Sequence, residues 1–155
     1  MSYSILVPLS DSPTSHSVLH YITHMPISAE DTDITLLNVY KEPAASQDLM
    51  GKSFVEKQKS RMSRFLDGVK DNLAEAGFDP DKIHIVLLKD HYPTVTDGIV
   101  AEFNRGNYDM VIIGRKHMSK AEEFVMGDIS IKLVRMLENT AILIVKQTGS
   151  KAQEQ

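Results

Sequence analysis

The sequence predicts an α/β protein with a single doubly wound, five-stranded parallel sheet and helices on both of its faces. Three observations lead to this prediction. Short apolar segments alternate along the chain with helical patterns, in the order β-α-β-α-β-α-β-α-β. The strand segments are apolar on both faces, which is typical of strands buried inside a parallel sheet. Parallel neighbours need crossover helices, and right-handed crossovers place those helices on the sheet's two faces.

The predicted strands are short runs rich in Val, Ile and Leu that end at turn residues. They span residues 3–9, 33–40, 82–88, 110–113 and 141–146. Pro8 and the polar Ser10 stop the first strand, and Gly114 follows the fourth. We place the reversal of strand order between these two strands, and such a reversal is where α/β sheets bind ligands.

The predicted helices carry apolar residues at helical spacing. They begin at residue 13 or 14 and near residues 52, 94 and 128, and end near residues 25, 76, 104 and 138. Ser12 is the expected N-cap of the first helix, with Pro13 at its first helical position. The expected core face of this helix is Ser15, Val18, Leu19 and Ile22. The last helix is expected to bury Ile129, Leu133, Met136 and Leu137.

At 155 residues, the chain is expected to form one domain over residues 1–147 with a polar tail at 148–155. The net charge of −4 argues against a nucleic-acid partner, because neutralising phosphates needs surplus Lys and Arg. The absence of cysteine excludes disulfides and thiolate catalysis. No apolar run reaches membrane-spanning length, and no basic region precedes the first apolar stretch. We therefore expect a cytoplasmic location, no signal peptide and no membrane contact.

The stretch from residue 111 to 132 combines a strand end, two glycines and a helix start. Gly114 follows the fourth strand, Gly127 comes thirteen residues later, and Asp128 opens the last helix. Glycine lets the backbone approach a ligand closely, and the N–H groups of a helix's first turn point at an anion. The intervening residues 114–127 are therefore predicted to form an anion-binding loop. Its apolar Phe124 is expected to be buried by the domain or by a partner subunit.

On these residues the chain resembles the universal stress protein family, a branch of the Rossmann-like, adenine-nucleotide alpha hydrolase-like domains. The likeness covers roughly residues 3–146 and includes ILVPLSDS at the start, YDMVIIGR before the loop and AILIVK at the end. Nucleotide-binding members carry glycine, two residues, glycine, nine residues, glycine, and then serine or threonine. Gly114 and Gly127 match the first and third glycines at the expected separation.

Other positions differ from this fingerprint. His117 stands at the second glycine, and Asp128 stands at the hydroxyl residue. Relatives that bind nucleotide usually carry aspartate and glycine after the first strand, where this chain has Ser10 and Asp11. The His117 side chain crowds a backbone that should lie beside phosphate. Asp128 can cap its own helix and would repel a triphosphate, at a cost of about 1–4 kcal/mol for a close like-charge pair.

The resemblance implies a nucleotide pocket at the ends of the first, second and fourth strands. Its candidate residues are Pro8, Leu9, Ser10, Val39, Gly114, Arg115, His117, Gly127, Asp128 and Ile129. Two hypotheses remain open. Asp128 and His117 favour a non-enzymatic stress-response or regulatory protein with a degraded pocket, acting through an unidentified protein partner. Gly114, Gly127 and Arg115 favour a switch or slow ATPase that binds ATP or AMP, with Mg²⁺ if ATP binds.

Catalytic and metal-binding patterns are not legible in the sequence. It has no Walker-type lysine motif and no metal-ligand helix motif. A phosphoacceptor protein with this fold would need acidic residues after the first strand and an aspartate after the third, and Asp11 and Asp90 could take these places. The spacing of Gly114 and Gly127 fits the universal stress protein family better. His16, His20 and His24 follow one another at four-residue spacing on the first helix, opposite its core face. We expect all three to face solvent, with a metal site as the less favoured alternative.

The last predicted strand, residues 140–146, is expected to lie at an edge of the sheet. An apolar edge strand invites pairing with another chain unless it is covered. Members of the family commonly dimerise through this strand. The resemblance therefore implies a homodimer with an isologous interface.

Overall fold

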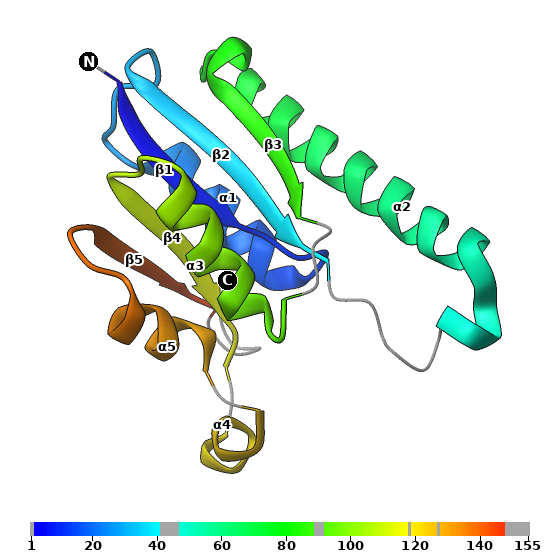
Figure 1. The fold of residues 1–155 in the computed structure, drawn as a ribbon. Helices are drawn as coiled ribbons and strands as arrows, with labels where there is room; N and C mark the ends of the chain where they lie inside the picture. Colours follow the sequence, from blue (N-terminus) through cyan, green and yellow to red (C-terminus); the bar gives the residue numbers. More distant parts are fainter. Residues whose placement is uncertain (1, 41–46, 89–91, 118, 127, 148–155) are drawn as a thin grey trace, which may run out of the picture.

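One parallel sheet organises the molecule. The computed structural model describes residues 2–40, 47–88, 92–117, 119–126 and 128–147. The strands are β1 (Tyr3–Pro8), β2 (Thr32–Val39), β3 (Ile83–Leu88), β4 (Met110–Arg115) and β5 (Ala141–Lys146). They lie in the order β3-β2-β1-β4-β5, with every neighbouring pair parallel (Figure 1). The order reverses between β1 and β4, which confirms the predicted switch point.

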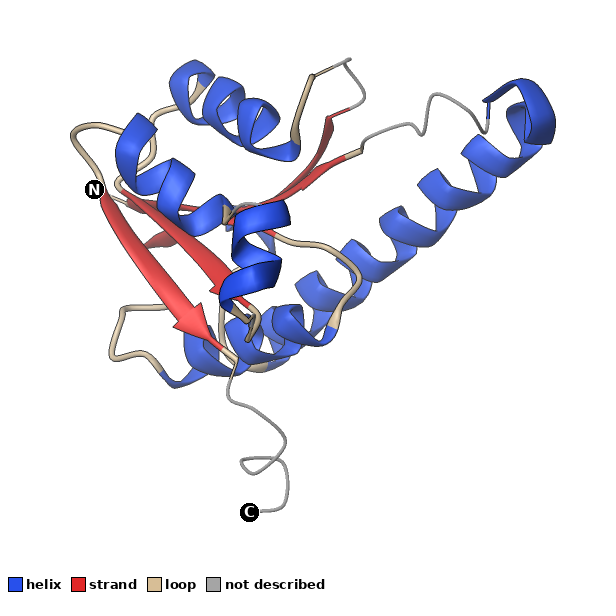
Figure 2. Cartoon of the chain, turned by 90° about the horizontal axis from the view of Figure 1, so that it is seen from below, coloured by secondary structure: helices blue, strands red, loops and turns tan. Residues whose placement is uncertain are grey.

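Helices cover both faces of this sheet. The helical elements are α1 (Pro13–His24), α2 (Gln47–Glu75), a 3-10 turn (Pro80–Lys82), α3 (Val95–Arg105), α4 (Lys120–Met126) and α5 (Ile129–Met136). Figure 2 shows helices on both sides of the strands. Side chains of α1 and α2 form one apolar cluster with the sheet, and those of α3 and α5 form another. The predicted doubly wound architecture is therefore confirmed. None of the helices in the described ranges is long and apolar enough to span a membrane.

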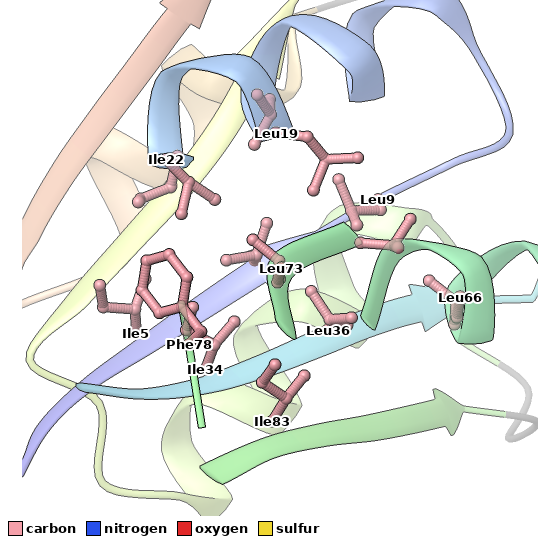
Figure 3. Close-up of a cluster of buried hydrophobic side chains, with 14 of the residues drawn as sticks. Ile5, Leu9, Leu19, Ile22, Ile34, Leu36, Leu66, Leu73, Phe78 and Ile83 are labelled. Atoms are coloured by element: carbon pink, nitrogen blue, oxygen red, sulfur yellow. The ribbon is translucent and has the colours of Figure 1, made fainter. Parts of the chain in front are cut away.

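The larger core lies between the sheet, α1 and α2. The residues that α1 buries are the predicted Ser15, Val18, Leu19 and Ile22. Figure 3 shows Leu19 and Ile22 on the side of α1 that faces the sheet and α2. Fully burying one such aliphatic side chain contributes about 1.5–3 kcal/mol. This packing fixes α1 against β4 and β5, and it sets the position of the loop that joins β1 to α1.

The second core lies between the sheet, α3 and α5. Its fully buried side chains include Leu6, Leu37, Ile99, Val111 and Leu133. The N-terminus of α3 is closed by a capping box between Thr94 and Asp97, which pairs two otherwise orphaned backbone N–H groups. The predicted start of this helix near residue 94 is therefore confirmed.

A buried carboxylate in α3 was not predicted. The Glu102 side chain is 1% exposed and accepts hydrogen bonds from Arg105 Nη2 at 2.5 Å and Tyr108 Oη at 3.1 Å. These charged and polar partners offset the cost of removing the carboxylate from water. Burial raises the pKa of Tyr108, so its hydroxyl stays protonated and remains a donor to Glu102 at neutral pH. The cluster holds the end of α3 against the segment that enters β4.

The prediction that residues 114–127 form a loop is wrong in part, because residues 120–126 form α4. The sequence signal for this helix was Ser119 followed three residues later by Glu122, the pattern of a capping box. Ser119 Oγ accepts a hydrogen bond from the backbone N–H of Glu122 at 3.2 Å, as a serine N-cap does. The side chain of Phe124 is 92% exposed, so the domain itself does not bury it.

The limits of α2 and the buried face of α5 also differ from the prediction. Helix α2 begins at Gln47, so part of the expected loop at 41–50 is helical, and residues 41–46 lie outside the described ranges. Helix α5 ends at Met136; its buried residues are Ser130 and Leu133, and the buried Leu137 follows as its C-cap. Ile129 and Met136 are 38% and 49% exposed, because they lie at the edges of the narrow stripe that this short helix presents to the core.

Candidate functional site

A cavity of about 160 Å³ lies beyond the carboxyl ends of the strands, at the switch point between β1 and β4. Its lining residues are Pro8, Leu9, Ser10, Thr14, Ser15, Val18, Leu37, Asn38, Val39, Val95, Ile99, Ile113, Gly114 and Ile129. The structure thus brings six of the predicted residues together around it: Pro8, Leu9, Ser10, Val39, Gly114 and Ile129. This is the place where open α/β sheets bind ligands.

Gly114 lies where β4 packs directly against α1. A Cβ at this position would lie 2.2 Å from Thr14 Cγ2 and 2.9 Å from Val18 Cγ2. The sequence assigns Gly114 to the site because glycine lets the backbone approach a ligand closely. The structure gives a second reason, since any larger side chain would push α1 away from the sheet.

The turn between β1 and α1 forms one wall of the cavity. Asn38 Nδ2 donates to the Leu9 carbonyl at 2.9 Å, and Ser15 Oγ donates to the Ser10 carbonyl. The Ser10 and Ser12 hydroxyl oxygens lie 3.0 Å apart. Side chains therefore bond the carbonyls of this turn and hold it in a defined conformation. A polar Asn38 at the end of an apolar strand was the signal for this contact.

Arg115 and Asp128 form an ion pair beside the cavity. Arg115 Nε lies 2.8 Å from Asp128 Oδ2, and their side chains are 27% and 6% exposed. Asp128 is also the N-cap of α5, because its Oδ1 accepts from Ser130 N at 2.9 Å and Ser130 Oγ at 2.5 Å. The predicted capping role is confirmed. The carboxylate thus occupies the N-terminus of α5, the position where an anionic ligand would otherwise bind.

The charged state of Asp128 is strongly favoured. Burial acts to raise the pKa of this carboxyl, but the hydrogen bonds from Ser130 and the charge of Arg115 outweigh burial. The net result is a pKa below the ordinary value of aspartate. At neutral pH the ion pair is therefore fully formed, and a phosphate approaching α5 meets a negative charge.

Replacing Asp128 with asparagine tests this charge, because asparagine is also a good N-cap. We expect Asp128→Asn to lower the free energy of unfolding by about 1.5–3 kcal/mol at pH 7, the range for a hydrogen bond to a charged group. A depressed folded-state pKa gives stability that is present above the unfolded-state pKa of about 3.9. The difference between the two proteins should therefore shrink as the pH falls through the folded-state pKa. Urea unfolding from pH 7 to pH 2.5 measures it, and a difference independent of pH would contradict the ion pair.

Of the other predicted residues, Arg115, His117 and Asp128 do not line the cavity. The His117 side chain is exposed, and Gly127 lies outside the described ranges. That His117 crowds a backbone beside phosphate stays a prediction.

Some lining residues were not predicted, namely Thr14, Ser15, Val18, Leu37, Asn38, Val95, Ile99 and Ile113. Several are core residues whose outer ends reach the cavity, and nothing in their local pattern separates them from other core residues. Val95 and Ile99 come from α3, one helical turn apart, and form the wall opposite α1. The contribution of α3 depends on how the helix packs against β2, which local sequence does not specify.

The histidines of α1 face solvent, as predicted. The rings of His20 and His24 lie 4.2 Å apart, and His24 Nδ1 lies 2.7 Å from the His20 carbonyl oxygen. Within the described ranges, no three His, Cys, Asp or Glu side chains converge to hold a metal ion.

Comparisons with known proteins agree with this geometry. The model of the universal stress protein family matches residues 1–146. Among similar solved structures, hypothetical protein MJ0577 aligns at 18% identity with a TM-score of 0.72, over 97% of this chain and 99% of its own. A universal stress protein in complex with cAMP aligns at 17% identity and 0.64, over 92% and 95%. UspA from Lactobacillus plantarum aligns at 11% identity and 0.68, over 92% and 97%.

No curated protein gives a significant match. Identities this low show a shared fold, whereas the family match rests on sequence over nearly the whole chain. The chain belongs to the universal stress protein family.

Proposed function

We propose that this protein is a non-enzymatic regulatory member of the family, a homodimer whose pocket does not accept nucleoside triphosphates. The observation that carries the proposal is the ion pair between Arg115 and Asp128 at the N-terminus of α5. The Asp128 carboxylate already accepts from the Ser130 N–H at the start of α5 and pairs with the Arg115 guanidinium. These are the groups that a phosphate would need. A triphosphate would have to displace it or accept its repulsion, at a cost of about 1–4 kcal/mol.

The chemistry of the cavity also supports a non-enzymatic role. None of the described residues that line it carries an acidic, basic or imidazole side chain. General acid–base catalysis needs such a group within hydrogen-bond reach of the substrate. The protein would then act through contacts with an unidentified protein partner in the cytoplasm, without nucleic acid or membrane. The net charge of −4 is in keeping with that choice of partner.

Calorimetric titration with ATP and Mg²⁺ at physiological salt tests the proposal. We expect no binding and no release of inorganic phosphate at millimolar ATP. Micromolar binding of ATP would overturn the proposal and favour a nucleotide-dependent switch. That alternative draws support from Gly114 and Arg115 and from the structural neighbour in complex with cAMP. The double substitution Asp128→Ser with His117→Gly is expected to create ATP binding if the rest of the pocket is intact.

The dimer is proposed to form by pairing of β5 with its copy. The N–H groups of Ala141 and Gln147 donate to carbonyls on the β4 side, at 3.3 Å and 2.9 Å. The N–H and C=O groups of successive residues point to opposite sides of a strand. Those of Ile142, Ile144 and Lys146 therefore point away from β4, toward the edge of the sheet, because β5 is the last strand in the order. Nearby on α5, Ile131 and Val134 are 42% and 55% exposed. An open strand edge beside exposed apolar side chains suits an isologous interface.

A proline at Ile144 tests this pairing, because it removes an outward-facing N–H and leaves the ladder with β4 intact. We expect the wild-type protein to sediment at twice the 17.4 kDa of one chain and the Ile144→Pro variant as a monomer. Ile144→Ala is the matched control, since it loses similar packing but keeps the N–H and should stay dimeric. A monomeric wild-type protein, or a dimeric Ile144→Pro variant, would contradict pairing through β5.

A further inference from the structure

Two histidines near the end of α1 lie side by side on its exposed face. The ring centroids of His20 and His24 are 4.2 Å apart, and both residues are exposed. Residues four positions apart lie one above the other on a helix, so α1 holds the two imidazoles together as long as it is folded. Two histidines at this spacing can bind one metal ion, with metal–nitrogen bonds of about 2.0–2.1 Å for zinc.

A hydrogen bond fixes the tautomer of His24. Its Nδ1 lies 2.7 Å from the His20 carbonyl oxygen, which also accepts from Thr23 Oγ1 at 3.0 Å. A carbonyl oxygen can only accept, so this contact assigns the proton of the neutral His24 ring to Nδ1 and its lone pair to Nε2. Metal-binding histidines in proteins usually have this arrangement, with one ring nitrogen donating to a carbonyl or carboxylate and the other bound to the ion.

The position of the pair on the helix also favours a cation. His24 is the last residue of α1, and His20 lies one turn before it. The last carbonyl groups of a helix have no partners within it, so the C-terminus carries a partial negative charge that stabilises cations. His16 has the same spacing to His20 but lies a further turn away from this end. The helix dipole therefore favours the pair of His20 and His24 over the pair of His16 and His20.

From these observations we propose that His20 and His24 form a binding site for one divalent transition-metal ion, with Cu²⁺ bound most tightly. The protein ligands are Nε2 of His24 and a ring nitrogen of His20, and water fills the other positions around the ion. A given set of nitrogen ligands binds Cu²⁺ more tightly than Ni²⁺ or Zn²⁺. Mg²⁺ is a poor fit, because it prefers oxygen ligands. Neither histidine lines the cavity at the switch point, so the site is independent of the proposed function.

An ion bound by both rings stabilises the folded helix. In the unfolded chain His20 and His24 are no longer held side by side, so the ion binds the native state more tightly and shifts the unfolding equilibrium by mass action. Cu²⁺ should therefore raise the midpoint temperature of unfolding. An ion bound to a single histidine gains nothing from the fold and should cause no such increase.

Calorimetric titration of the protein without an affinity tag tests the proposal, with Cu²⁺ as the ligand and Mg²⁺ as the ion that should not bind. His20→Ala and His24→Ala should each weaken Cu²⁺ binding at least about ten-fold, because a two-point attachment becomes a single one. Both variants should also lose the increase in unfolding temperature caused by Cu²⁺. His16→Ala is the matched control, because it removes an exposed histidine from the same helix and should leave both measurements unchanged.

Three outcomes would overturn the proposal. The first is that the wild-type protein does not bind Cu²⁺. The second is equal affinity in the wild-type protein and His24→Ala, which would place the ion on other histidines. The third is weaker binding in His16→Ala than in His24→Ala, which would place the ion between His16 and His20. Circular dichroism without metal checks that each variant is folded, as expected for substitutions at exposed positions.

Discussion

Replacing Gly114 with alanine is expected to lower the free energy of unfolding by about 1–3 kcal/mol, the usual cost of overpacking a core. The added Cβ would lie 2.2 Å from Thr14 Cγ2 and 3.3 Å from the Thr14 carbonyl oxygen. The Thr14 methyl group and the α1 backbone both lie in the space that the added Cβ would occupy. Relieving both contacts requires a shift of the helix. Urea denaturation monitored by circular dichroism measures the loss.

Gly68→Ala is the matched control, because it makes the same chemical change where space is free. A Cβ on Gly68 in α2 would meet no atom within 4 Å. Alanine is the better helix former by about 1 kcal/mol, so this variant should be more stable than the wild type. Opposite signs for the two substitutions are the expected result. Equal effects would mean that α1 does not approach β4 as closely as the structure has it.

The fold was predictable from sequence because its determinants are local and repeated. The apolar segments that became strands, such as residues 141–146, end at turn residues that local chemistry marks. The buried face of α1 followed from spacing alone, since Val18, Leu19 and Ile22 can share only one side of a helix. Helix α5 was harder. With eight residues it has few core positions, and spacing could not tell which of its apolar side chains the sheet covers.

The site was predictable where it depends on strand ends and less so where it depends on contacts across space. Asp128 was expected to cap α5, because an aspartate before a helical pattern has that role. Its pairing with Arg115 was not expected, since the two residues are separated by a segment whose path the sequence does not give. Arg115 was instead expected to attract a phosphate. The buried Glu102 was missed for a similar reason, as one of its partners, Tyr108, lies beyond the end of its helix.

Leu133→Ala should lower the free energy of unfolding by about 2–5 kcal/mol. The Leu133 side chain is fully buried and packs in one cluster with Leu6, Val111 and Ile113. A helix of eight residues is not stable alone, so α5 depends on its packing against the sheet. That packing comes from Leu133 and, one turn later, Leu137. Removing the larger contact therefore threatens the helix as a unit.

The loss of α5 should reach the site, because the helix carries both Asp128 and Ile129. In Leu133→Ala, the amide protons of Lys132 and Leu137, which bond the carbonyls of Asp128 and Leu133, should lose protection from hydrogen exchange before the rest of the sheet does. Lys132→Ala changes the exposed neighbour and should alter stability by no more than about 0.5 kcal/mol. A Leu133→Ala variant as stable as this control would mean that α5 is held by contacts other than its buried leucines, and the link between the core and the ion pair at Asp128 would not hold.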